Sequence, residues 1–219
     1  MGWRTGTLPF KGGGYASRYA WLPTVFVLLL FMSSMNAADS EALYPMATFA
    51  ERESPEWGSI DDGVMGGLSN SRLERTAEGT GVFAGRVSLA NNGGFASVRA
   101  ALGPTDLSAF RGVRIRFRGD GKRYRLRLHS SSGFDGIAYQ ASFDSAPDKW
   151  QEVSIPFSDF RPTFRGRLLD DVEPLDTGSI YQVGLMIADR QEGPFRLEVD
   201  WIGAYGTSAS GNGANAKER

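Results

Sequence analysis

The residues best suited to chemistry lie in one short segment, where two adjacent carboxylates meet several glycines. It reads Asp61-Asp62-Gly63-Val64-Met65-Gly66-Gly67. Carboxylates beside flexible backbone suit Ca²⁺ binding, and a carboxyl pair, or Asp135 elsewhere, also suits general acid–base hydrolysis. The alternative is a turn in which Asp accepts backbone N–H bonds and Gly supplies positive φ. The glycine spacing differs from a dinucleotide-binding motif.

Arginine is the second chemical signature, with 20 Arg against 4 Lys. Six of them alternate with apolar residues along two neighbouring segments: Arg114, Arg116, Arg118, Arg123, Arg125 and Arg127. Period-two spacing puts three on one face of each strand. If the strands pair through the turn at 119–122, all six share a face that suits a phosphate, an anionic lipid or an acidic partner. The alternative is a solvated face whose cations pair with acids such as Glu198 and Asp200.

Aromatic side chains are the third group, because Trp and Tyr rings can stack on sugars. Trp150 and Trp201 alternate with polar residues and are predicted to be core residues, whereas Trp57 lies in a loop context and is a candidate binding residue. His129, at the end of an expected strand, is predicted to be a packed or surface residue. No nucleophile–base pair can be named from these residues.

Composition excludes several classes of site. The chain has no Cys, which removes disulfides, thiol nucleophiles and Cys-ligated zinc or iron–sulfur centres. A single His disfavours a His-rich metal site and a Ser-His-Asp triad. The formal net charge of −1 argues against a nucleic-acid partner. We therefore expect no resident metal and no cofactor.

The elements that position these residues are predicted to be short β-strands separated by Gly- and Asn-rich turns. Only residues 107–110 and 177–181 look helical. About eight strands without a βαβ alternation predict an all-β protein, a β-sandwich of the jelly-roll type. The expected strands cover residues 81–89, 95–101, 113–118, 123–128, 137–143, 150–155, 183–187 and 195–202.

The two ends of the chain differ from this body. Residues 1–38 contain three cations and no acid, an apolar run from Ala20 to Met32, and then small residues. That order predicts a signal peptide or a membrane anchor, with an organellar transit peptide as the alternative. The sandwich is expected over residues 44–206, and the polar segment 207–219 is expected to be disordered. Export predicts a periplasmic protein, or one anchored to the outer face of the inner membrane; the alternative location is mitochondrial.

Several segments together resemble a known family. They are Trp57–Ser69, Asn92–Arg99, Arg118–Tyr124, Trp150–Phe157 and Gly193–Leu197. Ordered along residues 48–205, they are similar to the complex I intermediate-associated protein family, whose eukaryotic member assists assembly of NADH:ubiquinone oxidoreductase. The resemblance implies a galactose-binding-domain-like jelly roll, a non-enzymatic assembly or binding role, and no catalytic residues. The mitochondrial member works from the matrix, whereas this leader indicates the other side of a membrane.

Two functions follow as hypotheses. The first is an interaction module that binds a protein partner, either complex I subunits or another membrane complex, through the segment 61–69 and the arginine face. The alternative is an exported module of the cell envelope that binds a carbohydrate or another ligand. A galactose-binding fold together with an export signal motivates this alternative, although fold alone is a weak guide to function.

Overall fold

The computed structural model describes residues 42–50, 54–133 and 135–206. The chain divides into two units, residues 1–38 and 39–219, and every described residue belongs to the second. The expected leader and the expected tail (207–219) lie outside the described residues. Within the described ranges, no helix is long and apolar enough to cross a membrane.

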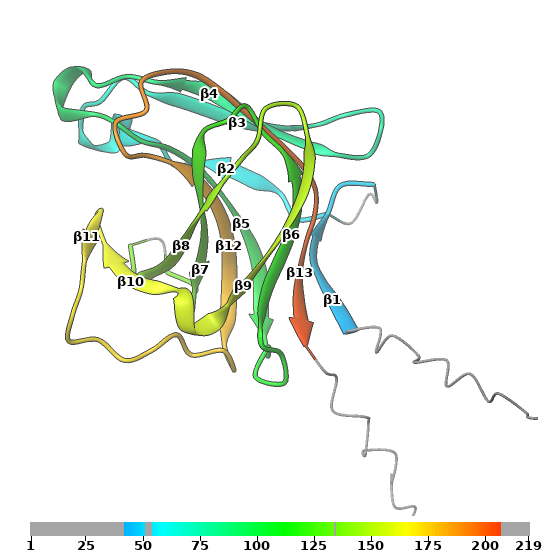
Figure 1. Cartoon of the computed structure of the whole chain (residues 1–219). Helices are drawn as coiled ribbons and strands as arrows, with labels where there is room; N and C mark the ends of the chain where they lie inside the picture. Colours follow the sequence, from blue (N-terminus) through cyan, green and yellow to red (C-terminus); the bar gives the residue numbers. More distant parts are fainter. Residues whose placement is uncertain (1–41, 51–53, 134, 207–219) are drawn as a thin grey trace, which may run out of the picture. The chain divides into compact units, whose positions relative to one another are not determined.

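Two antiparallel sheets make up the described structure (Figure 1). The six-stranded sheet has the order β3-β4-β13-β6-β9. The long strand β13 pairs with β4 through residues 193–199 and with β1 through residues 201–206. The strands of this sheet are β1 (Ala42–Thr48), β3 (Asn70–Arg75), β4 (Gly81–Val87), β6 (Gly112–Arg118), β9 (Trp150–Pro156) and β13 (Gly193–Gly206).

The seven-stranded sheet has the order β11-β10-β8-β7-β12-β5-β2. Its strands are β2 (Trp57–Ser59), β5 (Ala96–Thr105), β7 (Arg123–His129), β8 (Ala138–Asp144), β10 (Arg161–Phe164), β11 (Arg167–Leu168) and β12 (Ile180–Ile187). Three short 3₁₀ helices lie in the connections: η1 (Asp62–Met65), η2 (Ala90–Asn92) and η3 (Phe157–Asp159).

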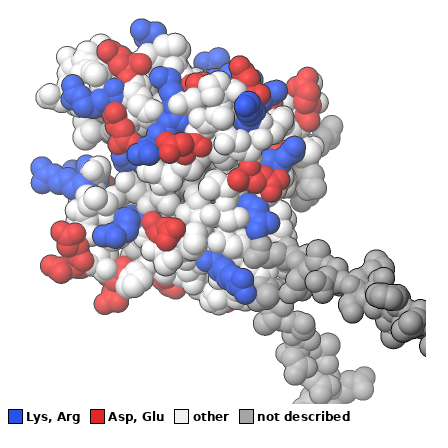
Figure 2. Space-filling view, viewed as in Figure 1, with Lys and Arg blue, Asp and Glu red and all other residues white. Residues whose placement is uncertain are grey.

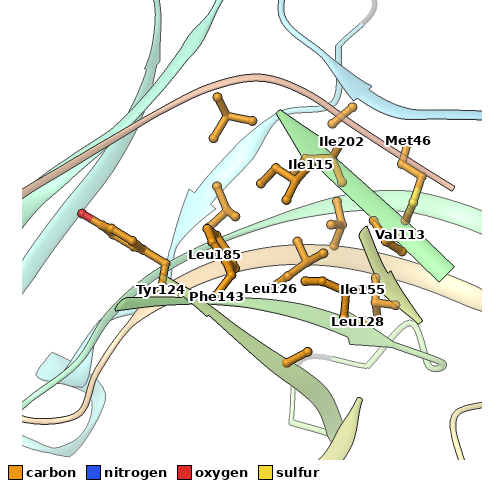
Figure 3. Packing of buried hydrophobic residues seen from close by; sticks show 14 of the residues in the cluster. Met46, Val113, Ile115, Tyr124, Leu126, Leu128, Phe143, Ile155, Leu185 and Ile202 are labelled. Atoms are coloured by element: carbon orange, nitrogen blue, oxygen red, sulfur yellow. The ribbon is translucent and has the colours of Figure 1, made fainter. Parts of the chain in front are cut away.

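The core lies between the two sheets, because each strand alternates apolar residues inward and polar residues outward. Figure 3 shows Val113, Ile115 and Ile202 of the six-stranded sheet facing Leu126 and Leu185 of the seven-stranded sheet. All five are fully buried. Tyr124, Phe83, Phe143 and Phe195 add a cluster of ring contacts with centroids 4.8–6.5 Å apart. This all-β sandwich confirms the predicted fold class.

Two local predictions are wrong. Residues 107–110 form a single hydrogen-bonded turn, not a helix: the Phe110 N–H donates to the Leu107 carbonyl, and Leu107 is buried. Residues 177–181 hold a turn and the start of β12. In both cases a buried apolar side chain beside a turn imitates helical periodicity. By contrast, the predicted turn at 91–94 is present, with Asn91 and Asn92 at φ of 53° and 59°.

The predicted pairing of the two arginine-rich strands is also wrong. β6 belongs to the six-stranded sheet and β7 to the seven-stranded sheet. The turn at 119–122 therefore carries the chain from one sheet to the other instead of closing a hairpin. Gly119 forms an isolated parallel bridge with Pro147, and Tyr124 donates its hydroxyl hydrogen to Asp120 at 2.9 Å. The six arginines consequently occupy the outer faces of two different sheets.

The predicted burial of Trp150 is wrong as well. Trp150 pairs with Arg118 in the register of β9 and β6, so it shares the outer face of the six-stranded sheet. Its residue is 37% exposed. Trp201 is half-buried, at a register shift between residues 199 and 201 of β13. Such a shift changes which side chains point inward.

Candidate functional site

Asp61 joins the two sheets. Its Oδ2 accepts the backbone N–H of Ser71 at 2.8 Å, and its Oδ1 accepts the Ser71 hydroxyl at 2.6 Å and the Ser97 N–H at 2.9 Å. Ser71 belongs to β3 of one sheet and Ser97 to β5 of the other. The Asp61 carboxylate is therefore a structural link at one edge of the sandwich.

Asp62 is fully buried and holds the next turn together. Its Oδ1 accepts the Ser69 N–H at 2.9 Å, and its Oδ2 accepts the Ser69 hydroxyl at 2.5 Å and the Gly94 N–H at 2.7 Å. Burial by itself raises the pKa of Asp62, but these hydrogen bonds outweigh it and hold the pKa below its ordinary value. The ionised carboxylate of Asp62 is therefore the form that holds this turn together.

The close packing around Asp62 leaves no room for a side chain at Gly67 or Gly93. A Cβ on Gly67 would lie 2.3 Å from Asp62 Oδ1, and a Cβ on Gly93 would lie 2.6 Å from Asp62 Oδ2. Gly66 ends η1 with a φ of 89°, which a glycine adopts readily. The hydrogen bonding of this segment is that of the capping turn, the alternative proposed from the sequence. The carboxylate oxygens that a Ca²⁺ ion or an acid–base reaction would need here accept hydrogen bonds from the protein itself.

The third carboxylate, Asp135, lies elsewhere, exposed, with one oxygen 2.5 Å from the guanidinium of Arg165. That guanidinium holds the pKa of Asp135 below its ordinary value. Across the described ranges, no three His, Cys, Asp or Glu side chains gather as a potential metal site.

The same segment presents apolar side chains to solvent, which we call the apolar tip (Met65 and Leu68). Met65 is 58% exposed and Leu68 is 61% exposed, while Gly63 and Gly66 beside them are also exposed. The Asn91 amide donates to the Gly66 carbonyl at 3.2 Å and braces the turn. Large exposed apolar side chains that lie close together can form part of a protein-binding surface.

Trp57 contributes to packing more than to a binding surface. It opens the edge strand β2, is half-buried, and stacks on Phe49 with ring centroids 6.1 Å apart. Its indole nitrogen is buried and has no hydrogen-bonding partner within the described part of the chain.

The arginines of the six-stranded sheet are paired, as the alternative interpretation expects. Arg118 lies 2.8 Å from Glu198, and Arg116 contacts Asp200. Arg114 donates to the Ser154 hydroxyl at 2.7 Å. Burial raises the pKa of Glu198, but hydrogen bonds from Arg118 and Thr80 outweigh it and lower the pKa overall. The guanidiniums of Arg116 and Arg118 also lie over the Trp150 ring, and Figure 2 shows basic and acidic side chains intermixed over the visible face of the molecule.

The arginines of the seven-stranded sheet differ among themselves. Arg123 lies 2.8 Å from Asp144, and Arg125 contacts Asp189. Arg127 has no hydrogen bond or ion pair with any residue that the structure describes. Burial, followed by the positive charges of Arg99 and Arg125, lowers the pKa of Arg127 to about 10. Sequence spacing points to Arg127 but misses Arg99, which reaches this face from β5.

Comparison with known proteins identifies the family of this chain. The family model described as complex I intermediate-associated protein 30 (CIA30) matches residues 47–199, more than half of the chain. The chain belongs to the CIA30 family. The resemblance read from the sequence is thereby confirmed, and the matched residues include the segment 61–69.

Two of its curated relatives are longer proteins. One is the probable complex I intermediate-associated protein 30 of Caenorhabditis elegans. It is 31% identical over 159 residues, which cover 64% of this chain and 46% of that protein. The mouse protein is 35% identical over 104 residues, covering 46% of this chain and 32% of its own. The chain thus spans about half the length, or less, of these relatives. Both are named mitochondrial, which agrees with the alternative location, whereas the expected export gains no support from them.

Solved structures show the same fold. The family 11 carbohydrate-binding module of a Clostridium thermocellum cellulase superposes with a TM-score of 0.58 at 19% identity, covering 78% of this chain and 97% of the module. An agarase shares the fold over 76% of this chain and 25% of its own, with a TM-score of 0.51 at 13% identity. This confirms the galactose-binding-like jelly roll, and identities this low concern the fold alone.

Proposed function

We propose that this CIA30-family chain is a non-enzymatic interaction module that assists the assembly of complex I by binding a protein partner, a subunit or an assembly intermediate of that complex. The observation that carries the proposal is the family match over residues 47–199. The relatives' names supply the link to complex I. The hydrogen bonding of Asp61 and Asp62 supports a binding role, because both carboxylates serve the fold.

The apolar tip is the surface that we assign to this partner. Its backbone is held by Asp62 and Asn91, so the backbone of this turn loses little further freedom when a partner covers the two exposed side chains. The arginines of the six-stranded sheet already pair with acids or a hydroxyl of neighbouring strands. They are therefore less suited to strong new contacts than an exposed Met and Leu.

The test is to isolate the tagged full chain at native level from gently solubilised membranes of its own host and to identify the co-purifying proteins. We expect complex I subunits with the unaltered chain and at least a several-fold loss with Met65→Ser combined with Leu68→Ser. Leu168→Ser is the matched control, since Leu168 is 63% exposed in β11, away from this segment. Recovery of no complex I subunit with the unaltered chain would refute the proposal.

Calorimetry and cell fractionation test the carbohydrate alternative and the location. The Trp150 ring, the most exposed indole among the described residues, is covered by two guanidiniums, which leaves it poorly placed to stack on a sugar. We expect calorimetric titrations with envelope polysaccharides to show no saturable heat. A saturable glycan signal together with a processed chain free in the periplasm would favour the envelope module instead.

A further inference from the structure

The six-stranded sheet ends at an open strand edge, which we call the β9 edge (Trp150–Pro156). β9 is the last strand in the order β3-β4-β13-β6-β9, and β6 is the one described element with extended backbone contact to it. Val153 of β9 lies opposite the fully buried Ile115 and so points to the core side, yet Val153 is only half-buried. Solvent therefore reaches the core side of the sheet at this edge.

Two observations show which backbone groups of β9 point away from β6. The N–H of Phe157, directly after β9, donates to the Arg111 carbonyl at 3.0 Å, which sets the alternation of hydrogen bonds between the two strands. Pro156 has no N–H, and a strand accommodates proline where its nitrogen faces away from the neighbouring strand. Both observations give the same alternation. The residues whose backbone groups point outward are Trp150, Glu152, Ser154 and Pro156.

The other ends of the two sheets are protected against pairing with a further strand. β3, at the far end of the six-stranded sheet, has its Ser71 N–H bound to the Asp61 carboxylate at 2.8 Å. β2 and β11, at the ends of the seven-stranded sheet, have three and two residues. Natural proteins usually keep sheet edges short, bulged or charged, because an unpaired edge binds other strands. β9 instead has seven residues, no Lys, a register with β6 without a bulge, and a proline only at its last position.

The sequence of β9 suits antiparallel pairing with a second copy of itself. A two-fold axis at Val153 uses the whole strand and places Glu152 opposite Ser154 of the second copy, and Trp150 opposite Pro156 of the second copy. Outward-pointing backbone groups then meet one another, so Glu152 and Ser154 exchange hydrogen bonds in both directions. Moving the axis to Glu152 would set two carboxylates directly opposite each other, which is unfavourable.

The exposed side chains are complementary in the register centred on Val153. Ser154 Oγ accepts a hydrogen bond from Arg114 at 2.7 Å, which leaves its hydroxyl hydrogen to be donated to the Glu152 carboxylate of the second copy. Trp150 is 37% exposed, with its ring flanked by two guanidiniums, and it meets the exposed Pro156 of the second copy. Trp and Arg side chains are enriched at protein interfaces.

We propose that two copies of this chain associate by antiparallel pairing of their β9 strands. The pairing joins the two six-stranded sheets into one continuous sheet. Because each copy presents the same edge across a two-fold axis, the assembly closes as a dimer. This proposal is independent of the partner assigned to the apolar tip.

The first test compares two full-length variants of equal charge change by sedimentation velocity in mild detergent. Ser154→Glu places a second carboxylate opposite Glu152 of the other copy, and Ser142→Glu is the matched control. Both serines are exposed and lie opposite an arginine, but Ser142 belongs to β8, an inner strand of the other sheet. We expect dimers of the unaltered chain and of Ser142→Glu, and about tenfold weaker association of Ser154→Glu. Monomers at every concentration up to about 100 µM, or equal association of the two variants, would overturn the proposal.

A single introduced cysteine tests the register, because the chain has no cysteine of its own. In Val153→Cys the two thiols meet at the two-fold axis, on residues with Cα atoms about 4.5 Å apart, which suits a disulfide. In Ser154→Cys they lie on diagonal residues, about 7–8 Å apart. Mild oxidation should therefore link two chains of Val153→Cys several-fold faster, as seen on non-reducing gels. Equal rates, or faster linkage of Ser154→Cys, would refute the pairing.

Discussion

Asp61 and Asp62 are adjacent in the sequence, yet each carboxylate holds a different part of the sandwich. Asp61 accepts donors from β3 and β5 and so connects the sheets, whereas Asp62 gathers the N–H groups of Ser69 and Gly94 around one buried position. A buried carboxylate with this many donors is stable only as the charged form. The chemical character that makes such residues look catalytic in a sequence is here used for folding.

Replacing Asp62 with Asn should be strongly destabilising. An amide group supplies one acceptor oxygen and turns an NH₂ group toward donors, so at least one buried N–H loses its partner. We expect a loss of about 2–4 kcal/mol in the free energy of unfolding, measured by urea denaturation. Asp170→Asn, at an exposed loop position, is the control and should change stability by less than about 0.5 kcal/mol. Equal stability of Asp62→Asn and the unaltered chain would contradict the structural role of the Asp62 carboxylate.

The pKa of Asp62 adds a pH dependence of known sign. Because its folded pKa lies below the ordinary value of 3.8, its contribution is present above that value and is lost as the pH falls through the folded pKa. Asp62→Asn should therefore abolish part of the acid destabilisation seen in the unaltered chain. A variant with an unchanged acid transition would indicate that other carboxylates control it.

His129, the only histidine in the chain, gives a second and separable pH effect. Burial, followed by the charges of Arg99 and Arg127, lowers its pKa to about 3, and the backbone of Ile137 acts weakly in the opposite direction. Between pH 6.5 and 3 the unfolded chain binds a proton on His129 that the folded chain does not. Stability should consequently fall with pH below 6.5, by about 2 kcal/mol between pH 7 and pH 5. His129→Leu should flatten this slope in urea titrations at each pH, and an unchanged slope would assign it to other groups.

At the scale of elements, the sequence predicts most strands but not their partners. Alternation is strong in β6 and β7, whose predicted and observed bounds agree to within one residue, whereas β13 extends beyond the predicted 195–202 at both ends. The turn at 119–122 looks like a hairpin turn, yet Asp120 accepts both the Tyr124 hydroxyl and the Arg196 N–H, and the chain crosses between sheets there. Local pattern carries no information on that choice, since both outcomes bury the same apolar faces.

The candidate site shows the same limit. Arg127 stands out by its spacing, but its neighbours Gly184 and Arg99 come from strands 57 and 28 residues away along the chain. Their proximity depends on long-range pairing, which periodicity cannot reveal. The short strands β2, β10 and β11 are likewise not predicted, because two to four residues hold too few alternations to be recognised. The longer strands β1 and β3 are missed as well.

Strand pairing can be checked directly because the chain has no cysteine. Arg125→Cys with Ser142→Cys places two thiols on opposed residues of β7 and β8, where Cα separations of about 4.5–5.5 Å suit a disulfide. Arg125→Cys with Arg116→Cys places them on strands of different sheets. We expect mild oxidation to close a disulfide within the first variant only, shown by mass spectrometry after alkylation. Rapid closure in the second variant would restore the hairpin and contradict this topology.

On the scale of the whole molecule, the sandwich separates its two proposed surfaces. The apolar tip lies in the connection between β2, an edge strand of the seven-stranded sheet, and β3 of the six-stranded sheet, whereas the β9 edge lies at the opposite end of the six-stranded sheet from β3. The close-packed core between the sheets (Figure 3) makes each surface a rigid platform. A substitution that leaves the core intact at one surface should therefore leave the other unchanged.

This separation yields a crossed prediction that distinguishes the two proposals. Met65→Ser with Leu68→Ser should lose co-purifying complex I subunits and keep the association of two copies. Ser154→Glu should do the reverse, because neither change alters a buried apolar contact of the core cluster. The two readouts, mass spectrometry of the purified complex and sedimentation velocity, are measured on the same four chains, the unaltered protein and Ser142→Glu included. If the unaltered chain is a monomer and Ser154→Glu releases the complex I subunits, the strand that pairs with β9 belongs to the partner and not to a second copy.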